Sequence, residues 1–125
     1  MSLNDLSYEI IGTAIRIHSE LGSGLREAVY EAALASELRR GGHDVGQQVV
    51  IPITVGGRRI GKGARIDLIV DGQIALEVKS ARGISMQDVK QIVTYLKVLD
   101  LRLGLILNFG VASLREGIKR VVNQL

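Results

Sequence analysis

Residues 64–80, which read ARIDLIVDGQIALEVKS, constrain this chain more than any other stretch. Two apolar runs, Ile66–Val70 and Ile74–Val78, flank the pair Asp71-Gly72. An Asp-Gly pair between runs rich in Ile and Val predicts a β-hairpin. Both runs are almost continuously apolar, which is typical of strands that are covered on both faces. The sequence therefore predicts a central hairpin with other elements packed on each side of it.

Three charged residues, Asp67, Glu77 and Lys79, interrupt the apolar pattern of this hairpin. Glu77 and Lys79 are two positions apart, so on a strand they project from the same face. Burying an ion in a sheet costs several kcal/mol unless the ion is paired or binds a metal. The hairpin is therefore the first candidate for a functional site. The alternative is that these charges lie at strand ends, with Asp67 solvated or capping a turn.

The register of the hairpin decides whether Asp67 and Glu77 can act together, because facing residues of antiparallel strands share a side. A two-residue loop at Asp71-Gly72 would place the two carboxylates on opposite faces. A three-residue loop, Val70–Gly72, would pair Asp67 with Ala75 and bring the carboxylates to one side. We expect the second arrangement, or a bulge or strand splay near Asp67, with the carboxylates about 4–6 Å apart.

Length and composition limit the class of protein. A chain of 125 residues is expected to form a single domain, residues 1–125. Its 46% hydrophobic and 23% charged residues are typical of a soluble globular protein. The absence of cysteine excludes a disulfide framework, thiol catalysis and Cys-ligated zinc. A polar N-terminus and the lack of an apolar run near ~20 residues predict a cytoplasmic protein without a membrane partner.

Around the hairpin, apolar periodicity and turn residues predict further helices and strands. The segment 103–109 closely follows a helix, so a right-handed crossover should set it parallel to the Glu77 strand. Pro52 indicates that its own strand lies at a sheet edge or that the nitrogen of the proline faces outward. The fold class is thus α/β, a mixed sheet with an antiparallel central hairpin flanked by helices. The expected elements are a helix capped by Asn4 or Asp5 and ending at Leu21, helices 26–40 and 85–99, strands 45–55, 66–70, 74–78 and 103–109, and a tail with a short turn and a strand.

Basic residues are in mild excess and are clustered. The net charge is +3, and Arg outnumbers Lys eleven to five. Each cluster permits contact with phosphates but does not establish it, and the ordinary explanation of any one cluster is solvated surface. The clusters are Arg39-Arg40, Arg58-Arg59 with Lys62 and Arg65, and Lys119-Arg120.

The segment Gly24–Tyr30, GLREAVY, has the pattern that names the GxxExxY protein family. The chain also resembles this family in RIDLIV, ALEVKS, QIVTYL, GLILNFG and GIKRVV, so the resemblance covers nearly its whole length. The family falls within the PD-(D/E)XK nuclease superfamily. The resemblance therefore implies a restriction-endonuclease-like core and a magnesium-dependent (or manganese-dependent) nuclease. One departure is Arg26, where an aliphatic residue is expected and which could partly neutralise the adjacent Glu27.

The resemblance also implies roles for particular residues. It places Asp67 and Glu77 as the metal-binding carboxylates, with the carbonyl of Val78 as a further ligand. It makes Glu27 a helical acid that holds a second Mg²⁺ or a metal-bound water. Lys79 becomes the lysine that assists the attacking water and stabilises developing negative charge. These residue types suit phosphodiester hydrolysis, since Mg²⁺ prefers oxygen ligands.

Substrate contacts are implied for Gln91 and Tyr95, which match a QxxxY signature of exonuclease-like branches and would otherwise be ordinary boundary residues of a helix. Arg58 and Arg59 are further candidates for phosphate contact. The expected partner is nucleic acid, DNA in the first instance, and a small domain of this kind could act on a duplex as a homodimer. Two alternatives are a binding module that keeps the fold without turnover, and a purely structural network of the buried charges.

Overall fold

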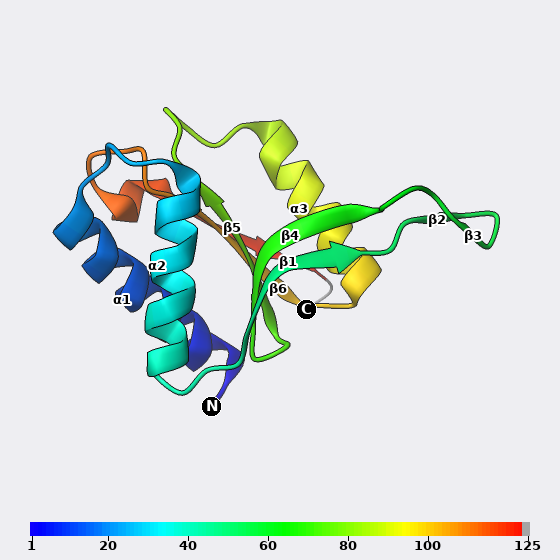
Figure 1. Ribbon diagram of the computed structural model, residues 1–125, viewed down its shortest axis with the longest axis horizontal. Helices are drawn as coiled ribbons and strands as arrows, with labels where there is room; N and C mark the ends of the chain where they lie inside the picture. The colour runs from blue at the N-terminus through cyan, green and yellow to red at the C-terminus, as the bar shows by residue number, and fades with distance from the viewer. Residues whose placement is uncertain (124–125) are drawn as a thin grey trace.

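The computed structural model describes residues 1–123. Within this range, five strands form one mixed sheet in the order β1-β4-β5-β6-β7, and two short strands form a separate ribbon. Helices α1 and α2 lie together on one face of the sheet and α3 lies on the other (Figure 1). In chain order the elements are α1 (Leu3–Leu21), α2 (Glu27–Arg40), β1 (Val45–Ile51), β2 (Thr54–Val55), β3 (Arg58–Arg59), β4 (Ala64–Val70), β5 (Ile74–Lys79), α3 (Met86–Leu99), β6 (Leu103–Asn108), the short 3-10 helix η1 (Leu114–Gly117) and β7 (Ile118–Val122).

The sheet separates two hydrophobic cores, and β5 contributes to both. Ile74, Leu76 and Val78 pack in the core beneath α1 and α2, whereas Ala75 packs in the core beneath α3. This alternation is what a strand covered on both faces requires. Strands β5 and β6 are parallel and connected through α3, while the other strand pairs are antiparallel. The predicted mixed α/β fold with a central antiparallel hairpin is confirmed, as is the predicted turn and strand of the tail.

Side-chain caps define where the helices begin. Ser2 caps α1, and Asp5 completes a capping box with it, so the predicted cap at Asn4 or Asp5 is wrong and lies too late in the sequence. Ser85 and Asp88 form the same type of box at the start of α3. The second helix begins at Glu27 rather than at residue 26, which serves as its N-cap.

The predicted strand 45–55 is divided into two. Strand β1 ends at Ile51, directly before Pro52, and residues 54–55 belong to the separate ribbon. Proline has no N–H to donate to a ladder, which explains the break. The predicted edge position is confirmed, because β1 is the outermost strand of its sheet.

The hairpin loop has three residues, but the register is not the predicted one. Val70 pairs with Ile74, so the loop is Asp71–Gln73, and Ala75 pairs with Ile69 rather than with Asp67. The predicted loop is thus displaced by one position. The physical reason is tertiary: the carboxylate of Asp71 accepts a hydrogen bond from the backbone of Asp44 (2.8 Å) and contacts His43 (2.7 Å).

The face to which β4 side chains point changes at Asp67. Leu68 packs beneath α1 and α2, whereas Ile66 packs beneath α3, although two residues in this spacing normally share a face. Opposite Asp67 on β1 lies Gln48, whose backbone is left-handed with φ 50°. The regular alternation of both strands is therefore broken at this pair. The predicted irregularity beside Asp67 is confirmed.

Candidate active site

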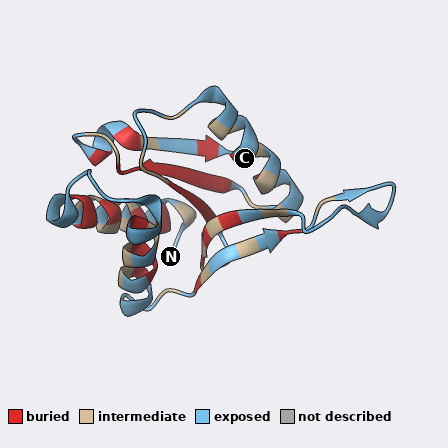
Figure 2. Ribbon diagram, turned by 45° about the horizontal axis from the view of Figure 1, so that its top comes forward, coloured by how far each residue is buried: buried red, intermediate tan, exposed pale blue. Residues whose placement is uncertain are grey.

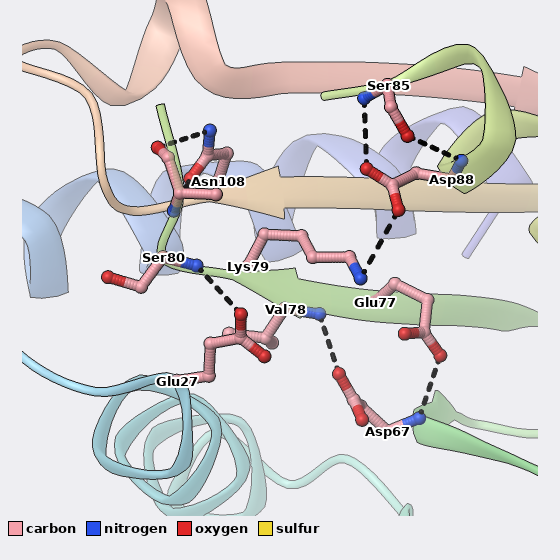
Figure 3. Close-up of polar contacts among 10 residues, drawn as sticks. Glu27, Asp67, Glu77, Val78, Lys79, Ser80, Ser85, Asp88 and Asn108 are labelled. Atoms are coloured by element: carbon pink, nitrogen blue, oxygen red, sulfur yellow. Dashed lines mark hydrogen bonds and ion pairs between the residues drawn. The ribbon is translucent and has the colours of Figure 1, made fainter. Parts of the chain in front are cut away.

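The carboxylate of Asp67 lies between β4 and β5, where it replaces part of their hydrogen-bonding ladder. The backbone N–H of Val78 donates to Oδ2 of Asp67 over 2.8 Å. The backbone N–H of Asp67 in turn donates to Oε1 of Glu77 over 3.2 Å (Figure 3). The last regular pair of the hairpin before this point is Leu68 with Leu76. The strands therefore separate at Asp67, and the separation brings Asp67 and Glu77 together.

Glu77 is a buried carboxyl group with an altered affinity for protons. Its relative exposure is 9%. Burial raises the pKa of Glu77 to about 7, the negative charge of Asp67 contributes to that rise, and the hydrogen bond from the backbone of Asp67 opposes it. A carboxyl group with a pKa near 7 inside a fold is more common at functional sites than elsewhere. A cation placed between the two carboxylates would remove the electrostatic cost that raises the pKa.

The side chain of Lys79, at the end of β5, extends to the start of α3. Its Nζ lies 3.5 Å from Oδ1 of Asp88, and both side chains are about one-quarter exposed. Asp88 also accepts the backbone N–H of Ser85 through Oδ2 at 2.9 Å, so one carboxylate caps the helix and pairs with the lysine (Figure 3). The hydrogen bond from the backbone of Ser85 is the main reason that the pKa of Asp88 is lowered, and Lys79 adds to it. The lysine is thus anchored by a helix cap.

Glu27 lies at the first turn of α2 and meets the end of β5. Its Oε2 accepts the backbone N–H of Ser80 over 3.3 Å. The hydroxyl of Ser80 donates to the carbonyl of Leu25 over 2.8 Å. These two bonds join the start of α2 to the residue that follows Lys79. Figure 3 shows Glu27 on the same side of β5 as Asp67.

Tyr30 fixes the loop that precedes Glu27. Its hydroxyl donates to the carbonyl of Gly22 at 2.6 Å and accepts the N–H of Leu25 at 3.1 Å. Its ring is fully buried and stacks on Phe109, with ring centroids 4.5 Å apart. Two residues of the segment Gly24–Tyr30 thus have structural roles. Tyr30 holds the loop, and Glu27 projects toward the end of β5.

Two residues of this site were missed by reasoning from the sequence. Glu31 accepts hydrogen bonds from the side-chain amides of Gln47 (3.2 Å) and Gln48 (2.8 Å). The amide of Gln48 also donates to Oδ1 of Asp67 at 3.2 Å and so joins the two carboxylates. The pKa of Glu31 is raised by burial first and by the charge of Asp67 as well. Glu31 follows Glu27 by four residues, so the sequence alone could have placed both carboxylates on the same face of α2.

The predicted substrate-contact residues do not all reach the carboxylates. Tyr95 lies near Glu77: burial raises the pKa of its hydroxyl, and the charge of Glu77 raises it further. Gln91 is exposed one turn earlier on α3. Arg58 and Arg59 form β3 in the ribbon, which projects away from the sheet (Figure 1). The carboxylates and the basic pair are therefore separate features.

Within residues 1–123, no group of three or more His, Cys, Asp or Glu side chains is already arranged to hold a metal ion. The chemistry of the donor set nevertheless fits one. Mg²⁺ typically takes one or two carboxylates and keeps waters or phosphate oxygens as its other ligands. Asp67 and Glu77 supply two carboxylates, and the pKa of Glu77 is raised by burial first and by the charge of Asp67 second. A divalent cation is the partner that this pair of carboxylates fits.

Comparison with known proteins identifies one relationship. A family model described as the PD-(D/E)XK nuclease superfamily matches residues 4–121. Its restriction-endonuclease-like core agrees with the mixed sheet and flanking helices seen here. Neither the curated proteins nor the solved structures include a significant match. None of the helices within residues 1–123 is long and apolar enough to cross a membrane.

Proposed function

The chain belongs to the PD-(D/E)XK nuclease superfamily, and from that premise we propose that it hydrolyses phosphodiester bonds in nucleic acid with a divalent cation, Mg²⁺ or Mn²⁺. We also assign it to the GxxExxY branch on the pattern of residues 24–30. The observation that carries the proposal is the buried Glu77, which lies against Asp67 with its pKa raised to about 7. Such a pair is costly to a fold unless a cation binds to it.

Asp67 and Glu77 are the carboxylate ligands in this proposal, and the carbonyl of Val78 is a third. A bound divalent cation would act as a Lewis acid on the phosphate and on the attacking water. Asp67 is prepared for this role because its Oδ2 is already oriented by the N–H of Val78. Glu27, on α2 beside the end of β5, would hold a further water or a second cation through the carboxylate oxygen that does not accept the N–H of Ser80.

Lys79 positions the attacking water and stabilises negative charge as it develops on the phosphate. Its ion pair with Asp88 keeps the ammonium group at the edge of the site, on the same side as Tyr95. The hydroxyl of Tyr95 and the exposed amide of Gln91 then contact substrate phosphate. Each of these groups donates a hydrogen bond, which is what a phosphate oxygen accepts.

A second candidate function is a nucleic-acid-binding module without turnover. One observation favours it: the exposed pair Arg58 and Arg59 lies on the projecting ribbon, apart from the carboxylates, so phosphate contact there would not need a metal. Both functions retain the fold, and they differ in whether Asp67 and Glu77 bind a cation and support cleavage.

Two measurements separate these functions. Titration calorimetry should detect Mn²⁺ binding to the wild-type protein, and the Glu77→Gln substitution should weaken it at least about tenfold, whereas Glu20→Gln, at an exposed carboxylate on α1, should not. Labelled DNA and RNA, single- and double-stranded, should then be incubated with Mg²⁺, Mn²⁺ or EDTA. The nuclease proposal expects cleavage of at least one substrate only with metal, and loss of that cleavage in Lys79→Ala. Mn²⁺ binding without cleavage of any substrate would favour the binding module.

A further inference from the structure

Residues 52–63, which we call the arm, extend from the sheet as a two-stranded ribbon. Strands β2 and β3 form a sheet of their own, and every residue from 54 to 63 is exposed. Two views of the molecule show the arm projecting beyond the helices and the five-stranded sheet (Figures 1 and 2). Its residues therefore add little to either hydrophobic core.

The charge of the arm and its base has one sign. No acidic residue occurs between Asp44 and Asp67 in the sequence. Four basic residues lie in that interval, all of them exposed: Arg58, Arg59, Lys62 and Arg65. A concentration of positive charge on a projecting element matches a polyanion.

The ribbon presents its two arginines on opposite faces. Thr54 pairs with Arg59 and Val55 pairs with Arg58, with Gly56-Gly57 as the two-residue turn. Both turn glycines have positive φ, 58° and 78°, the combination that a tight hairpin turn of this kind requires. Because successive residues of a strand point to opposite sides, one guanidinium group projects from each face of the ribbon.

The base of the arm is tied to the sheet that carries the active site. The N–H of Ile60 donates to the carbonyl of Ile53 over 2.8 Å. At Gly63, with φ 74°, a Cβ atom would lie 2.3 Å from the carbonyl oxygen of Ile51. The backbone segments at Gly63 and Ile51 therefore approach closely. From Arg59 to Asp67 the chain spans eight residues, a reach of at most about 26 Å.

We propose that the arm enters the major groove of a B-form DNA duplex whose backbone lies at the Asp67–Glu77 site. This inference rests on the proposed nuclease function and names its substrate as duplex DNA. The major groove admits a two-stranded β-ribbon, and arginines on both faces would reach the phosphates on its two sides. The major groove of A-form RNA is too deep and narrow for such an entry, and a single strand has no groove.

Binding in EDTA tests the arm without cleavage. The probes are a hairpin-closed DNA duplex of about 20 base pairs, the same duplex in RNA, a single strand, and a DNA duplex of about 6 base pairs. At about 3.4 Å per base pair, the length of the short duplex is less than the reach of the arm. The test variants are Arg58→Ser with Arg59→Ser, and a shortened arm in which Asn-Gly replaces residues 54–59 between the bonded Ile53 and Ile60. The control is Lys97→Ser with Arg102→Ser, which removes two exposed charges elsewhere.

The arm proposal expects the double arginine variant to bind the long DNA duplex more weakly, with a salt slope that is lower by about 1.8. The ratio of wild-type to variant affinity should therefore fall about tenfold between about 50 and about 200 mM salt. The shortened arm should behave in the same way. The control variant should bind the long duplex with the affinity of the wild type. On the short duplex, all variants should bind with the affinity of the wild type.

Equal binding of the long duplex by wild type and both arm variants would overturn the proposal. So would an equal loss on the single strand or on duplex RNA, which would make the arm a non-selective phosphate contact. The proposed nuclease function is tested apart from this. Arm-dependent duplex binding without metal-dependent cleavage would retain the arm and reject the nuclease, and cleavage that is indifferent to the arm would do the reverse.

Discussion

Oδ2 of Asp67 accepts the backbone N–H of Val78 over 2.8 Å, in the place where a backbone carbonyl of β4 would otherwise pair with β5. One side chain thus completes the ladder of the central hairpin and forms part of the candidate active site. Substitutions at this residue affect both roles, so their effects on folding and on chemistry have to be measured separately.

The choice of substitution at Asp67 should determine whether the protein remains stable. Asn keeps a side-chain oxygen that can accept the N–H of Val78, whereas Ala leaves this buried donor without its partner. We expect Asp67→Ala to lower the free energy of unfolding by about 1–3 kcal/mol relative to Asp67→Asn. Urea unfolding at neutral pH measures the difference. Equal stability of the two variants would show that the hydrogen bond does not support the hairpin.

Glu77→Gln should stabilise the metal-free protein at high pH. The pKa of Glu77 is raised to about 7 in the folded state, so between about pH 4.5 and 7 the unfolded chain releases the proton first and folding stability falls as pH rises. Gln does not ionise and escapes this fall. In EDTA, the variant should exceed the wild type by about 2–3 kcal/mol above pH 7 and by much less near pH 4.5. The same advantage at both pH values would contradict the assignment of the shift to Glu77.

Reasoning from the sequence located the hairpin and its three charges, because continuous apolar runs around an Asp-Gly pair are a strong local signal. It did not predict the register. The loop position depends on bonds from His43 and Asp44 to Asp71, which join residues 28 and 27 positions apart. Local turn preferences do not predict contacts between residues so far apart in the sequence. The predicted separation of the two carboxylates, about 4–6 Å, stays a prediction.

The surroundings of the candidate site were less predictable than its centre. The pairing of Asp88 with Lys79 depends on how α3 packs against β5. Glu31 follows Glu27 at helical spacing, yet its link to Asp67 passes through Gln48, whose left-handed backbone no sequence rule indicates. Contacts that depend on packing and on backbone strain were therefore the ones missed.

Gln48→Gly should separate stability from activity. A left-handed backbone costs a residue with a side chain about 1 kcal/mol or more, and glycine adopts it freely. The variant should therefore be at least as stable as the wild type, while kcat falls about tenfold because the amide that joins Glu31 to Asp67 is lost. Gln48→Asn, which tolerates this backbone, is the matched control with a shorter amide. Unchanged kcat in Gln48→Gly would mean that the amide does not position Asp67.

Tyr30→Phe should impair the site from a distance. The substitution keeps the ring stack on Phe109 but removes the hydroxyl that holds the backbone of Gly22 and Leu25. We expect a loss of about 1–2 kcal/mol in unfolding free energy and a lower kcat, because Glu27 follows that loop. If cleavage by Tyr30→Phe equals that of the wild type at a temperature where both are folded, the loop does not position Glu27.

His43 should make stability depend on pH at the other end of the hairpin. Its ring nitrogens lie 2.7 Å from carboxylate oxygens of Glu9 and Asp71, and its pKa is raised, first by the hydrogen bond to Glu9 and then by that to Asp71. The stabilisation is complete below about pH 6.5, the unfolded value, and is lost as pH rises through the higher folded pKa. His43→Gln should reduce this loss above pH 6.5 in thermal unfolding scans. An identical pH profile in the variant would exclude the pair of ionic contacts.

Metal-dependent cleavage is the most direct test of the central claim, that Asp67 and Glu77 hold a divalent cation for phosphodiester hydrolysis. The measurement is the single-turnover cleavage rate of a duplex DNA of about 20 base pairs by the wild type and by Asp67→Asn, with Mg²⁺, Mn²⁺ or EDTA. We predict cleavage by the wild type with either metal, none in EDTA, and a loss of at least about 10³-fold in the folded variant. Cleavage by Asp67→Asn at the wild-type rate, or by the wild type in EDTA, would contradict the account.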